Sequence, residues 1–180
     1  MQDIPIPKLG SSDVLVKVEA AGINGGDVHL WHGGIQKEYL PIVLLHEISG
    51  RVEKIGSDVK NFKSADRVII DPILSCGRAE CIYCSSGRNN LCEWVGCMGI
   101  GHLGNNPSGK ELFFQYPNGG LAEYVKVPER NLIKMSESVS FEVGAKLPTV
   151  AVGLQAVKKI GIMFTDTVII NAASGSTGAC

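Results

Sequence analysis

The sequence predicts a mainly β fold, a closed or partly closed β-barrel with C-terminal helices. One observation is a series of short apolar or alternating runs in the first two thirds of the chain, separated by turns rich in glycine and proline. A second is a change to a helical pattern near Ser138. The chain also contains a cysteine-rich loop, "CGRAECIYCSSGRNNLC", which holds four of the six cysteines and is a candidate metal site.

Four stretches have the pattern of strands. "VLVKV" (14–18) alternates apolar and charged residues, as a half-buried strand does. The segment 40–56 combines an apolar run with a second alternating run at Val52–Ile55. "DRVII" (66–70) and "LAEYVKV" (121–127) follow, and the turn signal "NGG" precedes the last of them.

The helical pattern begins after Ser140, a residue type that often caps helices, and ends at Gly161. Pro148 lies inside it and predicts a break or kink, and hence two helices rather than one. An apolar β-branched segment, "TVIINA" (167–172), then predicts a strand that leads into a glycine-bearing turn.

Composition argues against several functional classes. Lys and Arg total 17 and Asp and Glu total 18, so we expect no nucleic-acid partner. No apolar run has the length of a membrane span, and the start "MQDIPIPKLG" does not resemble a signal peptide. We therefore expect a cytoplasmic protein with no membrane contact, in which clustered thiols are more often metal ligands than disulfides.

The loop cysteines are Cys76, Cys81, Cys84 and Cys92, with the spacing C-x4-C-x2-C-x7-C. Zinc commonly takes thiolates from a C-x2-C turn and from positions further along a loop. The alternatives are reduced loop cysteines or a disulfide pair. A four-thiolate zinc site leaves no open position for substrate, so the predicted site is structural.

Several motifs in order resemble the catalytic half of medium-chain dehydrogenases/reductases, the zinc-type alcohol dehydrogenases and their quinone-reductase-like branch. They include "VLVKVEAAGINGGDVH", "LLHEISGRVEKIGSDVKNFKSADRVI", the cysteine loop and "TVIINAASGSTG". The resemblance implies a GroES-like β-barrel catalytic domain with a zinc-binding loop, followed by a Rossmann domain that binds NAD or NADP. It also implies a small carbonyl, alcohol or quinone-like substrate.

The chain departs from the zinc-type members at the catalytic metal. Asn24 and Gly26 stand where those members have a cysteine ligand and a hydroxyl residue that relays a proton, while Asp27 is retained. Asn is a poor substitute for a thiolate ligand, and Gly cannot relay a proton. The third ligand is expected around residues 147–152, where "LPTVAV" offers no cysteine or acid.

His46 and Glu47 match the imidazole ligand of the family and its acidic neighbour. One ligand of three does not hold a catalytic zinc, and Asn at position 24 is typical of the quinone-reductase-like branch, which works without that metal. The candidate catalytic residues are therefore Asn24, Asp27, His46 and Glu47, with hydrogen bonds from Asn24 and His46 to polarise a carbonyl. The alternative for His46 is a hydrogen-bonded histidine on a strand.

The cysteine loop departs from the family spacing of C-x2-C-x2-C-x7-C. Strict register places Arg78 at the first ligand position, so two residues look inserted between Cys76 and Cys81. Such an insertion costs little entropy in a loop, and we expect Cys76 to remain the fourth ligand. Cys97 is the alternative.

The expected cofactor turn is Ser174, Gly175, Ser176, Thr177 and Gly178, with two residues after it. A βαβ unit needs about 30 residues, so we expect a vestigial turn, the first strand of an incomplete Rossmann domain, and no NAD(P) bound by this chain. The predicted division is a catalytic domain at 1–138, with a zinc lobe at 72–98, and linking helices with a truncated dinucleotide-binding domain at 139–180.

Two functions remain open from the sequence. One is a portion of an NAD(P)-dependent oxidoreductase that keeps its structural zinc, lacks the catalytic zinc and is inactive alone. The other is a non-catalytic, zinc-stabilised structural or interaction module, or a truncated gene product. An open barrel edge would also permit a homo-oligomer.

Overall fold

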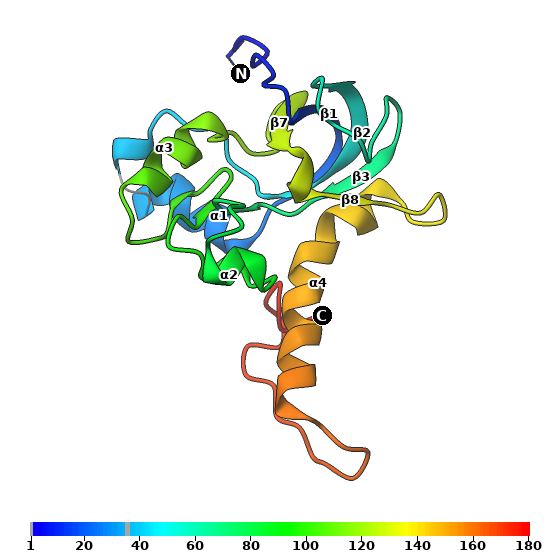
Figure 1. Cartoon of the computed structure of the whole chain (residues 1–180). Coiled ribbons are helices and arrows are strands. Elements are labelled where there is room, and N and C mark those ends of the chain that lie inside the picture. The colour runs from blue at the N-terminus through cyan, green and yellow to red at the C-terminus, as the bar shows by residue number, and fades with distance from the viewer. Residues whose placement is uncertain (1, 35–36) are drawn as a thin grey trace.

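The computed structural model describes residues 2–34 and 37–180, and its centre is a five-stranded antiparallel sheet (Figure 1). The strands lie in the order β7-β1-β2-β3-β8. Their bounds are β1 Asp13–Gly22, β2 Glu47–Ile55, β3 Arg67–Ile70, β7 Tyr124–Pro128 and β8 Leu132–Lys134. The alternating runs of the sequence therefore form this sheet, and the prediction of a mainly β fold is confirmed.

The sheet is curled because its edge strands are consecutive in the chain. Only the 3-10 turn η4 (Glu129–Asn131) joins β7 to β8. Five flat strands would place their edges about 19 Å apart, whereas this connection reaches at most about 14 Å. At Gly50 on β2, a Cβ would lie 2.1 Å from the carbonyl oxygen of Lys17 on β1, so the close packing of these strands requires glycine.

The core lies inside the curl. It consists of apolar side chains from the strands and from the segments that close the barrel, and the largest fully buried members are Phe113, Ile48, Ile70, Leu74, Met98, Val14, Val16, Val52, Val68, Val125 and Val127. Phe113 belongs to α3 (Ser108–Gln115), which therefore closes part of the barrel.

A smaller three-stranded sheet and short helices form the remainder of the barrel region. The small sheet has the order β4-β5-β6, and its strands have two residues each: β4 Ile73–Leu74, β5 Gly96–Cys97 and β6 Gly101–His102. The short helical elements are α1 Gly25–His29, η1 Leu30–Gly34, η2 Lys37–Tyr39, α2 Ile82–Ser85 and η3 Asn89–Leu91.

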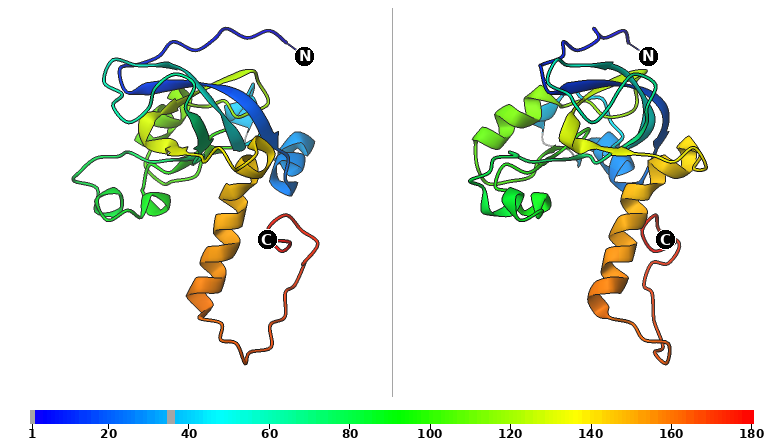
Figure 2. Two further views of the ribbon diagram at one scale, coloured as in Figure 1. Left: turned by 90° about the vertical axis from the view of Figure 1, so that its right-hand side faces the viewer. Right: turned by 45° about the vertical axis from the view of Figure 1, so that its right-hand side comes forward.

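Helix α4 (Phe141–Ile160) leaves the barrel and projects away from it (Figures 1 and 2). Ser140 caps its start and Gly161, with φ of 69°, ends it, as the sequence predicts. The expectation of two helices is wrong, because the helix runs through Pro148 without a break. The first turns of α4 pack against β1, β2 and β3, and this tertiary packing offsets the missing backbone hydrogen bond of Pro148.

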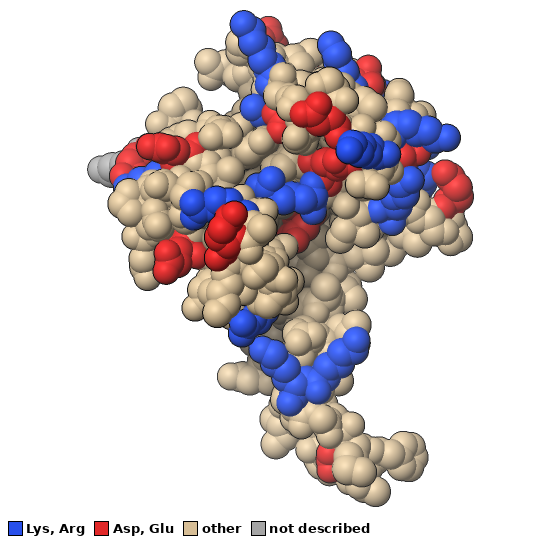
Figure 3. Space-filling model, viewed as in Figure 1, with Lys and Arg blue, Asp and Glu red and all other residues tan. Residues whose placement is uncertain are grey.

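The C-terminal segment returns along α4 as turns and irregular backbone (Figure 2). The strand expected at 167–172 is not formed, because no other described strand lies beside it to accept its hydrogen bonds. Apolar side chains here are exposed, Phe164 and Ile169 at 105% and 92%. Charges of both signs are interspersed over the barrel in Figure 3, whereas the lower part of the projecting arm is mostly uncharged.

No helix among the described residues is both long enough and apolar enough to cross a membrane.

Candidate functional site

Asn24 caps helix α1, and this role fixes the orientation of its side-chain amide. Asn24 Oδ1 accepts hydrogen bonds from the backbone N–H groups of Gly26 at 2.7 Å and Asp27 at 3.3 Å. In return, the Asp27 carboxylate accepts from the Asn24 backbone N–H at 2.9 Å, which completes a capping box. Since the amide oxygen faces the helix, the amide nitrogen must face the opposite side.

The Asn24 amide nitrogen lies between His46 and Glu47. It is 2.8 Å from His46 Nε2 and 3.1 Å from Glu47 Oε1. An amide nitrogen only donates, so His46 Nε2 is the acceptor and the proton of the neutral imidazole is on Nδ1. His46 Nδ1 faces Asp27 Oδ1 at 3.4 Å, and both atoms are buried with no closer hydrogen-bond partner in the described chain.

Glu47, at the start of β2, is the most buried acid of the cluster, with 1% of its surface exposed. Its Oε2 accepts from the Lys146 ammonium at 2.6 Å, and its Oε1 accepts from the Thr149 hydroxyl as well as from Asn24. Burial acts to raise the pKa of Glu47, but the hydrogen bonds from Lys146, Thr149 and Asn24 outweigh it and lower the pKa below its ordinary value. The carboxylate is therefore ionised and paired with an ammonium.

The four candidate catalytic residues thus come together, and two residues join them that sequence reasoning missed. Lys146 and Thr149 are three positions apart on α4, so both side chains lie on the helix face that meets the barrel. Their signal is present in the sequence, as a Lys and a Thr at i and i+3 beside the expected third-ligand position.

This cluster does not suit a divalent catalytic metal. The side chains that could ligate a metal here are all engaged otherwise. The Asn24 amide directs its N–H groups into the cluster, His46 Nε2 accepts a hydrogen bond, and the Glu47 carboxylate is bound by the Lys146 ammonium. A catalytic zinc needs three anionic or imidazole ligands and an open position. Residues 147–152 contribute no thiol or acid.

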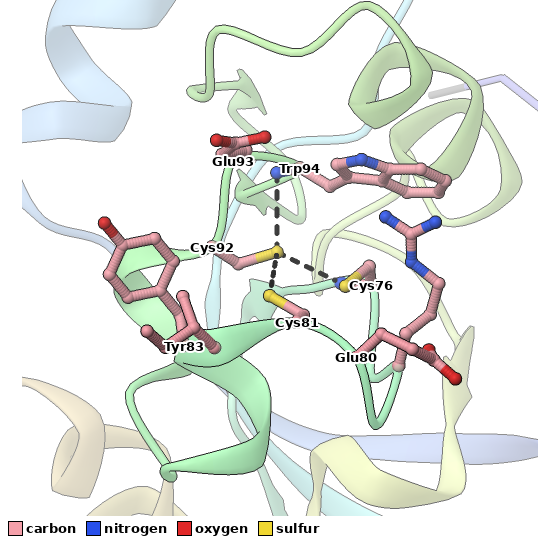
Figure 4. Close-up of a pocket in the computed structure, with 9 residues that line it drawn as sticks. Cys76, Glu80, Cys81, Tyr83, Cys92, Glu93 and Trp94 are labelled. Carbon is pink, nitrogen blue, oxygen red and sulfur yellow. Dashed lines mark hydrogen bonds between the residues drawn. The ribbon is translucent and has the colours of Figure 1, made fainter.

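The four loop cysteines converge at the other candidate centre, shown in part in Figure 4. Cys76, Cys81, Cys84 and Cys92 have all their sulfur atoms within 4.8 Å of one another. The Cys76–Cys84 and Cys81–Cys92 sulfurs are 3.7 and 4.0 Å apart. Four thiolates around one zinc lie about 3.8 Å apart, given a Zn–S bond near 2.3 Å. The donor set and spacing therefore fit a closed four-thiolate zinc site.

Backbone and side-chain donors surround these sulfurs. Cys92 Sγ accepts from the backbone N–H groups of Cys76 at 3.5 Å and Trp94 at 3.4 Å. Burial acts to raise the pKa of Cys76, but hydrogen bonds from the Arg78 backbone and guanidinium and from neighbouring thiols lower it to about 6. The Arg78 guanidinium also stacks over the Trp94 ring, 4.3 Å from its centre. The residue that strict register places at the first ligand position thus lies beside the cluster, while Cys76 supplies the sulfur.

Cys97 does not join the four sulfurs. It lies on β5 with 4% of its surface exposed, and burial raises the pKa of its thiol to about 12. An inert, buried thiol of this kind contributes to packing.

The predicted cofactor turn has no element that would make it a dinucleotide site. Ser174, Gly175, Ser176 and Thr177 are exposed, and Gly178 is half-buried, in consecutive turns. A pyrophosphate site of this kind needs a strand before the turn and the N-terminus of a helix after it. Neither is formed in residues 161–180, so this segment does not fit NAD or NADP.

Comparison with known protein families shows the family to which this chain belongs. The family model of the alcohol dehydrogenase GroES-like domain matches residues 10–137. The chain belongs to this family. The match covers the five strands of the main sheet, the four loop cysteines and the Asn24, Asp27, His46 and Glu47 members of the other cluster. Lys146 and Thr149, on α4, lie beyond the matched residues.

The chain matches part of the length of two curated relatives. "Probable D-xylulose reductase A" of Emericella nidulans is 37% identical over 178 residues, and sorbitol dehydrogenase of Macaca fascicularis is 34% identical over 179. Each match covers 96% of this chain and 45% of the relative. The chain therefore spans less than half the length of these relatives.

Two crystal structures have the same fold. An NAD-dependent alcohol dehydrogenase is 35% identical with a TM-score of 0.76, over 92% of this chain and 44% of that one. The cobalt- and zinc-bound thermostable alcohol dehydrogenase of Pyrobaculum aerophilum is 26% identical with a TM-score of 0.78, over 97% and 48%.

Proposed function

We propose that this chain is the catalytic-domain portion of an NAD(P)-dependent, alcohol dehydrogenase-like oxidoreductase that works without a catalytic metal. Family membership supports the reaction class, a transfer of hydride between a nicotinamide and a small carbonyl or alcohol. The Glu47–Lys146 ion pair carries the metal-free assignment, because it occupies the carboxylate beside His46 with an ammonium, in a cluster whose described residues offer no other free anionic ligand. We divide the chain after residue 138, so that the cysteine centre belongs to the first domain, whereas the Glu47 cluster also takes Lys146 and Thr149 from the second part.

In this proposal the cysteine lobe holds one structural zinc. Cys76, Cys81, Cys84 and Cys92 would bind it, and the ion would supply order to a polar loop with few apolar contacts of its own. The four thiols suit a reducing compartment such as the cytoplasm.

The nicotinamide would supply the hydride when bound, and this chain's part is to hold and orient the substrate. Asn24 and Asp27 fix α1 through the capping box, and the same amide fixes the tautomer of His46. Glu47 and Thr149 hold Lys146 and α4 against the barrel. The 180-residue chain is expected to be inactive alone, since its C-terminal turn does not fit the cofactor.

Zinc and cofactor measurements test this proposal. Metal analysis of the purified chain should give about one zinc per chain, and two would contradict the metal-free catalytic site. Titration with NADH or NADPH should give no saturable change in fluorescence or melting temperature. Saturable binding would show that the C-terminal turn works as a cofactor site and would contradict the inactivity proposed for this chain.

A second candidate is a non-catalytic, zinc-stabilised interaction module. The exposed apolar residues of α4 and the following segment favour it, including Leu154, Ile160, Phe164 and Ile169. Sedimentation analysis distinguishes the two candidates when it is combined with a substrate titration. Self-association without substrate binding favours the module, and substrate binding by a monomer favours the oxidoreductase.

A further inference from the structure

The hydrogen-bond donors of the Asn24–Lys146 cluster are almost all engaged within it. Asn24 directs its amide N–H groups to His46 and Glu47. His46 Nε2 is used as an acceptor, so it offers no proton to a ligand. Thr149 directs its hydroxyl to Glu47. None of these three groups has a spare donor for the oxygen of a substrate.

Lys146 differs from the other members of the cluster. Within the described chain its ammonium makes one hydrogen bond, to Glu47, and an ammonium carries three N–H donors. Its side chain is 44% exposed, whereas that of Glu47 is 1% exposed. Lys146 therefore combines a fixed, buried anchor with free donors that reach solvent.

Gly22 keeps one side of this ammonium open. It is paired with Glu47 across β1 and β2, and a Cβ at this position would lie 2.5 Å from Glu47 Oε2 and 3.3 Å from Lys146 Nζ. Any side chain here would displace the carboxylate or cover the ammonium. The backbone of β1 thus leaves room for the ion pair at the end of the barrel where α1 begins.

We propose that Lys146 is the residue that binds the oxygen of a small ketone or secondary alcohol, by a charge-assisted hydrogen bond from its free N–H groups. This inference rests on the proposed oxidoreductase function and names the group that performs the oxygen-binding role in a metal-free site. The ammonium provides the positive charge, Glu47 and Thr149 hold it in place, and His46 and Asn24 position Glu47. The sequence expectation placed that role on Asn24 and His46, whose donors are engaged elsewhere.

The test is a ligand titration of the zinc-loaded, 180-residue chain labelled with 15N. The probes are D-fructose and sorbitol, a ketose and the corresponding polyol, and the readout is the chemical shift of Gly22, Thr149 and the Lys146 side chain. Losing a charge-assisted hydrogen bond weakens binding by about 10- to 100-fold. We expect the lower end for Lys146→Met, because water screens an exposed cation.

Matched variants separate binding from folding. Lys158→Met removes an exposed lysine from the last turn of the same helix and should bind as the wild type does. Lys146→Arg keeps donors and charge and should retain part of the affinity. Because Lys146→Met leaves Glu47 buried without its cation, the double variant E47Q/K146M removes both charges and should show the same loss in a folded chain.

The inference would be overturned if the wild type, the single variant Lys146→Met and the double variant E47Q/K146M bound the two probes with equal affinity. The absence of a saturable shift at Gly22 and Thr149 in the wild type would also overturn it. Equal affinity would leave the proposed function in place, because the wild type would still bind substrate. The absence of any saturable shift would count against the proposed function as well only if the chain also self-associates in sedimentation. The zinc count and the cofactor titration are independent of both results.

Discussion

Replacing Lys146 by Met should destabilise the fold more than any other single lysine substitution on α4, because it isolates a buried charge. Glu47 is 1% exposed and accepts from Lys146 at 2.6 Å. Breaking a buried ion pair by removing one partner costs about 3–5 kcal/mol. Lys146 is 44% exposed, and Asn24 and Thr149 still donate to the carboxylate, so we expect a smaller loss, of about 2 kcal/mol.

The assay is urea unfolding of the zinc-loaded chain, with the slope m compared between variants to confirm that the same surface unfolds. Lys158→Met is the control and should change the free energy of unfolding by less than about 0.5 kcal/mol. In the double variant E47Q/K146M the uncharged Gln keeps the hydrogen bonds from Asn24 and Thr149, so most of the lost stability should return. A single variant as stable as the wild type would refute the ion-pair reasoning, as would a double variant no more stable than the single one.

Three further outcomes are expected. Cys97→Ser should keep about one zinc per chain whereas Cys92→Ser should lose it, and equal zinc contents would show that the ligand set is misassigned. Since the folded-state pKa of Glu47 is lowered, its contribution to stability is present above its ordinary pKa of 4.5 and is lost as the pH falls below that value. Glu47→Gln should therefore flatten the decline in unfolding free energy in that acidic window, measured by urea titration at several pH values, and an unchanged decline would contradict the shift. The double variant N24C/K146M supplies a thiolate and frees the carboxylate, so it should bind a second Zn²⁺ or give the absorption bands of a Co²⁺–thiolate, and a chain that still binds one metal would argue against this geometry.

The parts of the fold that the sequence predicted are those with a repeating local signal. The alternation at Val52–Ile55 marks β2, and Ser140 and Gly161 mark both ends of α4. The strands β4, β5 and β6 have two residues each, which is too short to show an alternation of apolar and polar residues. The sequence pattern therefore does not predict them. The break at Pro148 is predicted from a local rule about proline in helices. The packing of α4 on the barrel overrides that local preference.

The two candidate centres also differ in how far the sequence predicts them. The spacing of the cysteines along one loop is a local signal, and the structure gathers the same four sulfurs that the spacing suggests. The partner of Glu47 comes from 99 residues further along the chain, so only the docking of α4 brings Lys146 to it. A sequence pattern can mark the absence of a third metal ligand at 147–152, but it does not show which side chain faces the Glu47 carboxylate.

In the proposed metal-free centre, four positions depend on one another, Gly22, Asn24, Glu47 and Lys146. A cation at Lys146 needs the Glu47 carboxylate ionised and the space that Gly22 leaves, because a buried carboxylate is stable only when paired. Asn24 in place of a thiolate removes a negative charge that would compete for the ammonium, and its amide donates to the same carboxylate. A thiolate at position 24 beside Lys146, or a metal beside the ammonium, would leave the charges unbalanced. On the proposal of a metal-free centre, this cluster is better understood as a rearranged charge network than as a zinc site that has lost its ligands.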